Sequence, residues 1–273
     1  MTNSAHIGPI PQIGFGTWNR HGDEARNGVL CALETGYRHI DTAEGYDNEE
    51  YVGQAIAESG IARRDIFLTT KVAPESFGPG CIRPAVERSL DKLRTNQVDL
   101  LLLHYPSIND EYAIEDYIGQ FAEVYDAGLA RHIGVSNFTV SHIDRARTLL
   151  ADRKLATNQV ELHPFLRNAP IVEHCRALGI PVTAYSPLAR GAVAEDELLQ
   201  RIAHEKGATP AQIALAFLMA EGHIVIPSSA SPERIVSNFA AREIRLTDAE
   251  VVAVRGLDKD RRLVDGPWCP VWD

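Results

Sequence analysis

The stretch Val98-Asp-Leu-Leu-Leu-Leu-His104 is a short, apolar run that ends in a polar side chain. A strand with one face in water alternates apolar and polar residues, whereas a strand buried on both faces is apolar at consecutive positions, as this one is. Similar runs recur along the chain, and most are followed by an amphipathic segment. They lie at residues 12–17, 37–41, 65–71, 98–104, 131–136, 157–161, 181–185 and 223–227.

The segments between these runs carry helix start and stop signals. Asp47 with Glu50 has the spacing of a capping box, and Gly60 provides the stop. Strand and helix alternate over roughly 250 residues, which predicts an α/β fold of the (β/α)8, or TIM, barrel type. Because no linker interrupts the chain, we expect residues 1–273 to form a single domain with an extra C-terminal helix and a short tail. Other predicted helix starts are Thr209 before Pro210, Ser231 before Pro232, and Thr247 with Glu250.

Composition narrows the class of protein. The 273 residues hold 27 Lys and Arg against 37 Asp and Glu, a formal net charge of −10 at pH 7. This charge repels nucleic acids and anionic membranes, so we expect neither as a partner. The first ten residues, MTNSAHIGPI, lack the basic and apolar regions of an export signal. The most apolar helical stretch, residues 211–220, is about half the length that spans a bilayer.

The cysteines bear on the cellular compartment. The chain has four, and they are scattered with no C-x-x-C pair, which disfavours a zinc knuckle or a disulfide scaffold. We therefore expect a reduced, cytoplasmic protein. A barrel closes its own sheet, so no partner chain is required and we expect a monomer.

Polar side chains follow most of the predicted strands. In a (β/α)8 barrel the carboxyl ends of all strands meet at one face, where the chemistry of such barrels is found. The residues at these ends are therefore candidates for function. They are Asp41, Tyr46, Lys71, His104, Ser136, Asn137, Gln159, Glu161, Tyr185, Ser186, Ser228 and Ser229.

Four of these residues form a chemically complementary set for proton transfer to a carbonyl oxygen. Tyrosine alone is a poor acid at neutral pH, because its ordinary pKa is about 10. The ammonium group of Lys71 would favour the phenolate of Tyr46, and Asp41 would hold that ammonium in place. His104 would orient the carbonyl oxygen or relay the proton. Taken singly, each residue has a structural alternative: a buried Asp41–Lys71 ion pair, a rim tyrosine, and a core histidine.

The end of the last predicted strand has the features of an anion site. Ser228 and Ser229 precede a helix that begins near Ser231. Free backbone N–H groups and the helix dipole favour a phosphate at such a point. Arg234 lies in the first turn and would pair with a phosphate or stack on adenine, with a solvated surface charge as the alternative.

Several motifs together resemble the aldo-keto reductases, from about Ile10 to the C-terminus. The short tail and the Asp47-Asn-Glu stretch are most similar to bacterial 2,5-diketo-D-gluconate reductases, which also reduce small dicarbonyls such as methylglyoxal. The motifs are IGFGTW (13–18), GYRHIDTA (36–43) with Tyr46, Thr70-Lys71, LHYP (103–106), IGVSNF (133–138), Gln159, YSPL (185–188) and VIP (225–227) with Arg234 and Asn238.

The resemblance implies reduction of aldehydes and ketones to alcohols with NADPH, the substrates including small dicarbonyls and keto sugar acids. It implies that Asp41, Tyr46, Lys71 and His104 are the catalytic residues, with Tyr46 as the general acid. The nicotinamide cofactor would bind without a Rossmann fold, and the Gly14-Phe-Gly16 pair indeed lacks the third glycine of a dinucleotide fingerprint.

The resemblance also implies the residues that hold the cofactor. Ser136, Asn137 and Gln159 would bind the carboxamide group, and Tyr185 would stack on the nicotinamide ring. The remaining contacts would come from Gly16, Thr17, Trp18, Ser186, Leu188, Ser228, Ser229, Arg234 and Asn238.

The chain departs from the family pattern both in the cofactor region and in the substrate region. Many members have a lysine at the position of Ser228, where it contacts the 2′-phosphate of NADPH. Since Ser228 and Arg234 still offer donors to a phosphate, we expect NADPH to be preferred, with NADH as the alternative. Ala73 and Tyr105 stand where tryptophan is frequent, which predicts a wider and more polar substrate wall. Trp18, Trp268 and Trp272 would supply its apolar part, with packing against the barrel as the alternative for the last two.

Two other functions are considered. A metal-dependent barrel hydrolase would use His39, Asp41, His104 and His163, but the chain has no H-x-H pair at a strand end, so we expect no metal. A cofactor-binding regulatory subunit of a membrane channel, a role of some relatives, would bind NADPH tightly without turnover.

Overall fold

The computed structural model describes residues 6–273, and at its centre is a sheet of eight parallel strands. Its ends meet, because Ile13 forms a parallel bridge with Val225 and the N–H of Gly16 donates to the carbonyl oxygen of Pro227 at 3.0 Å. The sheet thus closes into a barrel. In sequence order its strands are β3 (Phe15–Gly16), β4 (His39–Asp41), β5 (Phe67–Val72), β6 (Val98–Leu103), β7 (Ala130–Ser136), β8 (Leu155–Glu161), β9 (Val182–Tyr185) and β10 (Ile224–Val225).

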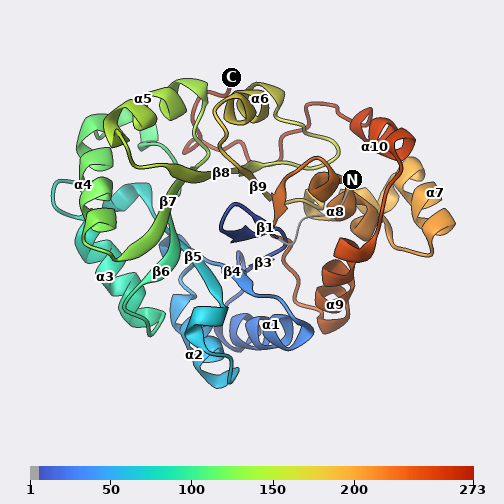
Figure 1. Cartoon of the computed structure of the whole chain (residues 1–273), viewed down its shortest axis with the longest axis horizontal. Coiled ribbons are helices and arrows are strands. Elements are labelled where there is room, and N and C mark those ends of the chain that lie inside the picture. Colours follow the sequence, from blue (N-terminus) through green and yellow to red (C-terminus); the bar gives the residue numbers. More distant parts are fainter. Residues whose placement is uncertain (1–5) are drawn as a thin grey trace.

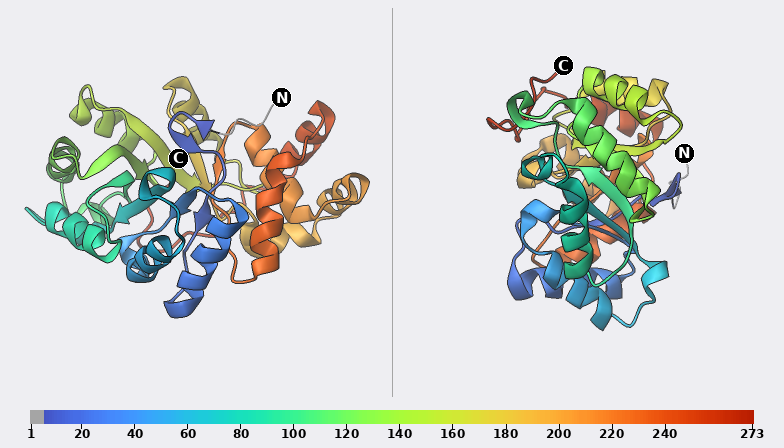
Figure 2. Two further views of the ribbon diagram at one scale, coloured as in Figure 1. Left: turned by 60° about the horizontal axis from the view of Figure 1, so that its bottom comes forward. Right: turned by 90° about the vertical axis from the view of Figure 1, so that its left-hand side faces the viewer.

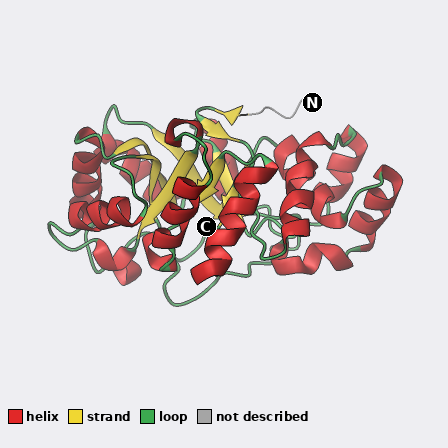
Figure 3. Cartoon of the chain, turned by 90° about the horizontal axis from the view of Figure 1, so that it is seen from below, coloured by secondary structure: helices red, strands yellow, loops and turns green. Residues whose placement is uncertain are grey.

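Helices surround the strands, as Figures 1 and 3 show. The predicted (β/α)8 barrel is therefore confirmed, and each of the eight apolar runs overlaps one of its strands. The helices are α1 (Gly22–Thr35), α2 (Glu49–Glu58), α3 (Ile82–Lys92), α4 (Ile114–Asp126), α5 (Val140–Leu150), α6 (Ala169–Ala177), α7 (Glu197–Lys206), α8 (Pro210–Ala220), α9 (Pro232–Ala240) and α10 (Asp248–Arg255). Short 3-10 turns near the strand ends are η1 (Glu44–Tyr46), η3 (Pro74–Ser76) and η5 (Ala189–Glu195).

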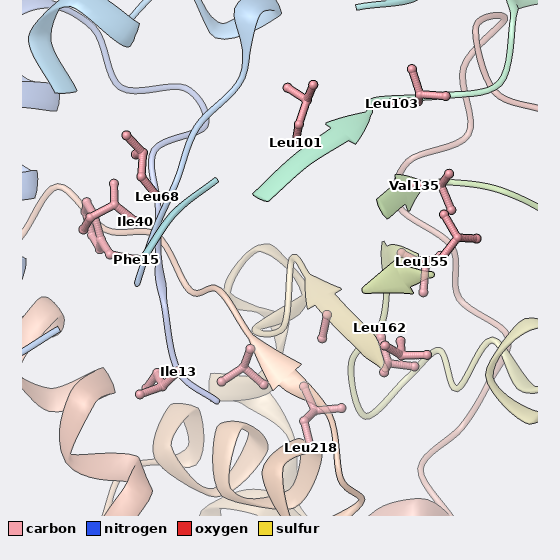
Figure 4. Close-up of a cluster of buried hydrophobic side chains, with 14 of the residues drawn as sticks. Ile13, Phe15, Ile40, Leu68, Leu101, Leu103, Val135, Leu155, Leu162 and Leu218 are labelled. Atoms are coloured by element: carbon pink, nitrogen blue, oxygen red, sulfur yellow. The ribbon is translucent and has the colours of Figure 1, made fainter. Parts of the chain in front are cut away.

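Alternation along β6 explains why its residues are apolar at consecutive positions. Leu101 and Leu103 belong to the large cluster between strands and helices, part of which is drawn in Figure 4. Leu100 and Leu102 belong to a second, smaller cluster with Ile10 and with Ile224 of β10. Successive side chains of a strand point to opposite faces, so β6 buries one face against helices and the other inside the barrel.

The observed helix starts agree with the predicted ones, except at the start of α2. Thr209 and Thr247 each form a complete capping box, and Ser231 accepts the N–H of Arg234. The capping box predicted for Asp47 with Glu50 is wrong. Asp47 has a left-handed backbone (φ 50°) that ends η1, and the helix begins one residue later than that box requires, after Asn48.

Two segments of the described chain, one early and one late in the sequence, cover the ends of the barrel. A hairpin of β1 (His6–Ile7) and β2 (Ile10–Pro11) lies on one side, and the chain after α10 lies on the opposite side (Figure 2). The prediction about an export signal falls partly on residues 1–5, outside the described part of the chain. Within residues 6–273, no helix has the length and apolar character to cross a membrane.

Candidate active site

A buried ammonium group lies at the carboxyl end of β5. Lys71 Nζ donates to Oδ1 of Asp41 at 2.5 Å, to the carbonyl oxygen of Thr42 at 2.7 Å and to the hydroxyl of Tyr46 at 3.3 Å. These three acceptors use all three protons of the ammonium. The lysine is 1% exposed, so its position is fixed by these bonds and not by solvent. The structure therefore brings together three of the four residues predicted for proton transfer.

Short loops place Tyr46 beside this ammonium. Asp41 ends β4, and η1 carries the chain from there to Tyr46. The Glu44 carboxylate accepts the backbone N–H of Ala73 and the hydroxyl of Ser76, both at 3.1 Å. Because Ala73 follows directly after β5, these bonds fix η1 against the strand that carries Lys71.

The electrostatics differ from the expectation for Tyr46. Burial, and then the charge of Asp41, raise the pKa of Tyr46 well above its ordinary value of 10. Burial also lowers the pKa of Lys71, and the Asp41 carboxylate opposes that shift. In the free protein, burial and the charge of Asp41 outweigh any lowering of the Tyr46 pKa by Lys71, and the stabilisation of the phenolate by Lys71 stays a prediction. Tyr46 therefore keeps its proton.

His104 follows β6 and lies edge-on to Tyr46, with ring centroids 5.4 Å apart and an interplanar angle of 74°. Burial, and then the nearby Lys71 charge, lower the pKa of His104 well below 6.5. The imidazole is therefore neutral at neutral pH and offers one N–H donor and one acceptor nitrogen. Its backbone is held by β5, since the His104 N–H donates to the carbonyl oxygen of Val72 at 3.0 Å.

The residues predicted to bind the carboxamide form one hydrogen-bonded network. Asn137 donates to the Ser136 hydroxyl at 3.1 Å and to the carbonyl oxygen of His104 at 3.0 Å, and it accepts the Tyr185 hydroxyl at 2.9 Å. Gln159 donates to Oδ2 of Asp41 at 2.8 Å. The carboxamide set is thus joined directly to the carboxylate that holds Lys71. The hydroxyl of Tyr185 is fixed by Asn137, which orients its ring.

The start of α9 has the chemistry of a phosphate site. Ser228 has a buried hydroxyl oxygen without a hydrogen-bond partner among the described residues. Ser229 accepts both the backbone N–H of Ser231 and Nε of the exposed Arg234, each at 3.1 Å. An unpaired hydroxyl, a guanidinium group and a helix N-terminus suit the phosphates of a nicotinamide cofactor. Asn238, from the same helix, is 5% exposed.

The predicted substrate residues differ in their exposure, and Tyr105 lies beside His104. Trp18 is 51% exposed and Trp268 is 48% exposed, whereas Tyr105 is half-buried beside His104, with ring centroids 5.3 Å apart. Burial raises the pKa of Tyr105 to about 12, and the nearby side chains of Trp268 and Tyr185 partly oppose this shift. Trp268 thus reaches the site.

Trp272, the other tail tryptophan, packs against the barrel and bonds within the tail. Its Nε1 donates to Asp265 at 3.1 Å, and the guanidinium of Arg262 lies 3.9 Å from its ring centroid. The guanidinium of Arg190, from η5, lies 5.6 Å from the ring centroid of Trp18. Packing is therefore the interpretation that the structure favours for Trp272.

The four residues of the hydrolase alternative do not converge. His39 contacts the hydroxyl of Thr69 at 3.1 Å, whereas His163 contacts Glu161 at 3.0 Å. Across residues 6–273, no group of three His, Cys, Asp or Glu side chains is arranged to hold a metal ion. The side chains of this alternative therefore have other partners.

Three residues that contact the site were given no role from the sequence. Glu44 and Asn48 each lie two positions from Tyr46 in the sequence. Polar side chains this close to a candidate catalytic residue could have indicated a supporting role. The position of Glu161 at a strand end was noted, but its partners Leu263 and Val264 lie about a hundred residues further on. Short-range sequence patterns carry no information on such a contact.

Comparison with known proteins places the chain in a family. The aldo/keto reductase family profile matches residues 12–259. "Methylglyoxal reductase DkgB" from Escherichia coli O157:H7 is 43% identical over 265 residues, which is 97% of this chain and 99% of the relative. An aldo-keto reductase from Mycolicibacterium smegmatis (strain ATCC 700084 / mc(2)155) is 38% identical over 94% of this chain and 93% of the relative.

Solved structures agree with these sequence relatives. A crystal structure described provisionally as a 2,5-diketo-D-gluconic acid reductase B matches with a TM-score of 0.94 and 41% identity, covering 100% of this chain and 98% of that one. The aldose reductase of Schistosoma japonicum matches with a TM-score of 0.88 and 34% identity, covering 93% and 91%. The chain therefore belongs to the aldo/keto reductase family and is a nicotinamide-dependent oxidoreductase that reduces carbonyl groups to alcohols.

Proposed function

We propose that the protein reduces small dicarbonyls, keto sugar acids and aldehydes with NADPH, and that Tyr46 is the general acid. The observation that carries this proposal is the position of the Lys71 ammonium between Asp41 Oδ1 and the Tyr46 hydroxyl. The substrate class is supported by the names of the relatives, a methylglyoxal reductase and a 2,5-diketo-D-gluconic acid reductase B.

The carbonyl oxygen of the substrate would lie between the Tyr46 hydroxyl and the neutral imidazole of His104. When bound, the reduced nicotinamide supplies a hydride to the carbonyl carbon. Negative charge then develops on the oxygen, and Tyr46 gives it the phenolic proton. The raised pKa of Tyr46 keeps the phenol protonated in the free protein, so the proton is present when the substrate oxygen becomes basic.

Lys71 acts after the proton has left. Tyr46 then becomes a phenolate whose oxygen lies 3.3 Å from the Lys71 ammonium. In the free protein Asp41 alone balances the charge of this ammonium, and after proton transfer the ammonium also stabilises the phenolate. Asp41 keeps the ammonium in place, and water returns the proton to Tyr46. His104 donates its N–H to the substrate oxygen and thereby orients it.

The cofactor would be held along one side of the barrel end. Ser136, Asn137 and Gln159 would bind the carboxamide, and the fixed ring of Tyr185 would support the nicotinamide. We propose NADPH over NADH because the unpaired hydroxyl of Ser228 and the Arg234 guanidinium suit an additional phosphate. The kcat/KM for each cofactor with one substrate tests this preference, and a clear NADH preference would contradict it.

Replacement of Tyr46 by phenylalanine tests the general acid. General acids are typically worth about 10²–10⁴ in rate, so Tyr46→Phe should lose that much kcat, whereas its Kd for NADPH should stay near the wild-type value. The assay follows oxidation of NADPH with methylglyoxal, a diketo sugar acid, an aromatic aldehyde and an aliphatic aldehyde. Tyr125→Phe, on α4 away from the site, is the matched control and should keep full activity.

Two results would overturn the assignment. Full activity of Tyr46→Phe would mean that another group donates the proton. Tight NADPH binding by the wild type without turnover of any tested carbonyl compound would favour the regulatory role instead.

A further inference from the structure

The end of β8 holds the C-terminal tail through one carboxylate. Glu161, the last residue of β8, is 0% exposed. Its Oε1 accepts the backbone N–H of Leu263 and its Oε2 accepts that of Val264, both at 2.8 Å. His163 also contacts Oε1, at 3.0 Å. One buried side chain therefore binds two successive amides of a segment that has no helix or strand of its own.

Burying a carboxylate is costly unless hydrogen bonds compensate the charge. At Glu161 burial alone would raise the pKa, but hydrogen bonds from His163 and from the Leu263 and Val264 amides outweigh it and lower the pKa. The carboxylate is therefore charged at neutral pH. Hydrogen bonds to a charged acceptor are roughly twice as strong as neutral ones, which makes this anchor stronger than an ordinary loop contact.

A compact turn follows the anchor and contains Trp268. The N–H of Cys269 donates to the carbonyl oxygen of Gly266 at 2.9 Å, and the Cys269 thiol donates to the carbonyl oxygen of Val264 at 3.7 Å. The turn is thus tied to one of the residues that Glu161 holds. Trp268 lies close enough to Tyr105 to affect the pKa of its hydroxyl, and the Tyr105 ring centroid lies 5.3 Å from that of His104.

A second set of bonds fixes the start of the tail on the same loop. The carbonyl oxygen of Phe165 accepts the N–H groups of Lys259 at 3.2 Å and Arg261 at 2.9 Å. The tail is therefore also fixed at residues 259–261, which precede in the sequence the residues that Glu161 binds. Figure 2 shows the tail crossing the barrel on the side away from the β1–β2 hairpin. Between this fixed start and the Trp268 turn, the chain is held by the two Glu161 bonds and by the Arg262 guanidinium, which donates to Asn168 Oδ1 at 3.3 Å.

We infer that Glu161 is a positioning residue for substrate selectivity: by binding the Leu263 and Val264 amides it holds Trp268 as a wall of the carbonyl site. This inference rests on the proposed function. A compact dicarbonyl is small enough to react between Tyr46 and His104 without the wall. An aromatic carbonyl compound needs an apolar surface for its ring, so its binding depends on Trp268.

Glu161→Gln tests the anchor with little change in shape. The NH2 group of the glutamine would face one of the two backbone N–H groups, so that hydrogen bond is lost. The other backbone N–H would donate to a neutral oxygen in place of a charged one. We expect the KM for 4-nitrobenzaldehyde to rise about tenfold, whereas kcat/KM for methylglyoxal and the Kd for NADPH change by less than about twofold. Hydrogen exchange at the amides of residues 263 and 264 should become faster. Glu161→Asp keeps the charge but shortens the reach, and should give a smaller shift in the same direction.

Two further variants separate the anchor from general damage. Asp99 is also a buried carboxylate, bound to the Leu68 N–H at 3.0 Å and to arginines at the amino end of β6, so Asp99→Asn should leave the ratio of the two substrates unchanged. Glu161→Gln and Trp268→Ala should not be additive on the KM for the aromatic aldehyde, because both act on the same wall.

The outcomes distinguish this inference from the proposed function. Normal turnover with an unchanged substrate ratio in Glu161→Gln, equal losses for both substrates, or additive effects with Trp268→Ala would each overturn the role of Glu161 alone. A wild type that turns over no carbonyl compound would overturn the proposed function and this role together. Unchanged hydrogen exchange would show that the carboxylate does not hold the tail.

Discussion

Burial acts on Tyr46 and His104 in opposite directions. It raises the pKa of the phenol and lowers the pKa of the imidazole, and both groups are thereby kept neutral over a wide range of pH. The tyrosine loses its proton only above its raised pKa, and the histidine gains one only below its lowered pKa. A protonated acid and a neutral N–H donor therefore exist together in the free protein.

This protonation predicts the pH dependence of the reaction. The kcat/KM for carbonyl reduction should be flat from about pH 6 to about pH 9, because neither residue changes its protonation in that range. The measurement is initial rates of NADPH oxidation at subsaturating substrate across buffers of constant ionic strength. A limb with an apparent pKa near 6.5 that disappears in His104→Gln would contradict the lowered pKa of the imidazole.

At the scale of elements, Asn48 joins the loops that carry the site. Its Nδ2 donates to the carbonyl oxygens of Thr17 and Arg20, both at 2.9 Å, and its Oδ1 accepts the Thr42 hydroxyl at 2.7 Å. The residue is 1% exposed, and it is located two positions after Tyr46. Asn48 therefore connects the loop after β3, the loop after β4 and the start of α2.

Asn48→Ala should lower the free energy of unfolding by about 2–4 kcal/mol, since it removes three hydrogen bonds and leaves the buried Thr42 hydroxyl without this acceptor. It should also lower kcat, because η1 loses its support. Urea unfolding followed by circular dichroism measures the first effect. Asn27→Ala, at an exposed position on α1, is the control and should change the free energy by less than about 0.5 kcal/mol. A loss equal to that of the control would rule out the bracing role.

The sequence was a good guide to elements and a poor guide to the bonds between them. Apolar runs locate all eight barrel strands because burial of both faces leaves a local signature. Thr209 and Thr247 also mark helix starts, because a capping box lies within four residues. The prediction failed at Asp47, where a left-handed backbone that composition does not reveal ends η1.

At the scale of the whole molecule, barrel topology explains why so much of the candidate site could be listed from the sequence. Parallel strands bring their carboxyl ends together, so Lys71 and Asp41 had to be near neighbours once the strands were located. The contact of Glu161 with the tail follows from no such rule, because the path of an irregular segment depends on packing. The balance of charge around Tyr46 likewise needed actual distances.

Buried histidines predict how the whole fold responds to acid. Burial lowers the pKa of His39 and of His223 to about 4 each, and Asp41 partly opposes the shift at His39. In the unfolded chain both titrate near their ordinary value of about 6.5. The stability that depends on keeping them neutral is therefore fully present above about pH 6.5 and is lost as the pH falls toward about 4, a total of a few kcal/mol.

His223→Asn isolates one of these protons. The free energy of unfolding, measured with urea between about pH 7 and about pH 4, should fall less steeply with decreasing pH in the variant than in the wild type. The difference in slope corresponds to at most one proton, because asparagine has no charged form to exclude from the core. The wild type and the variant should therefore differ most in stability at the neutral end and converge, or cross, toward acid. His204→Asn, on the exposed face of α7, should keep the wild-type slope. Parallel curves for His223→Asn and the wild type would mean that the imidazole of His223 is hydrated and does not contribute to the acid sensitivity of the barrel.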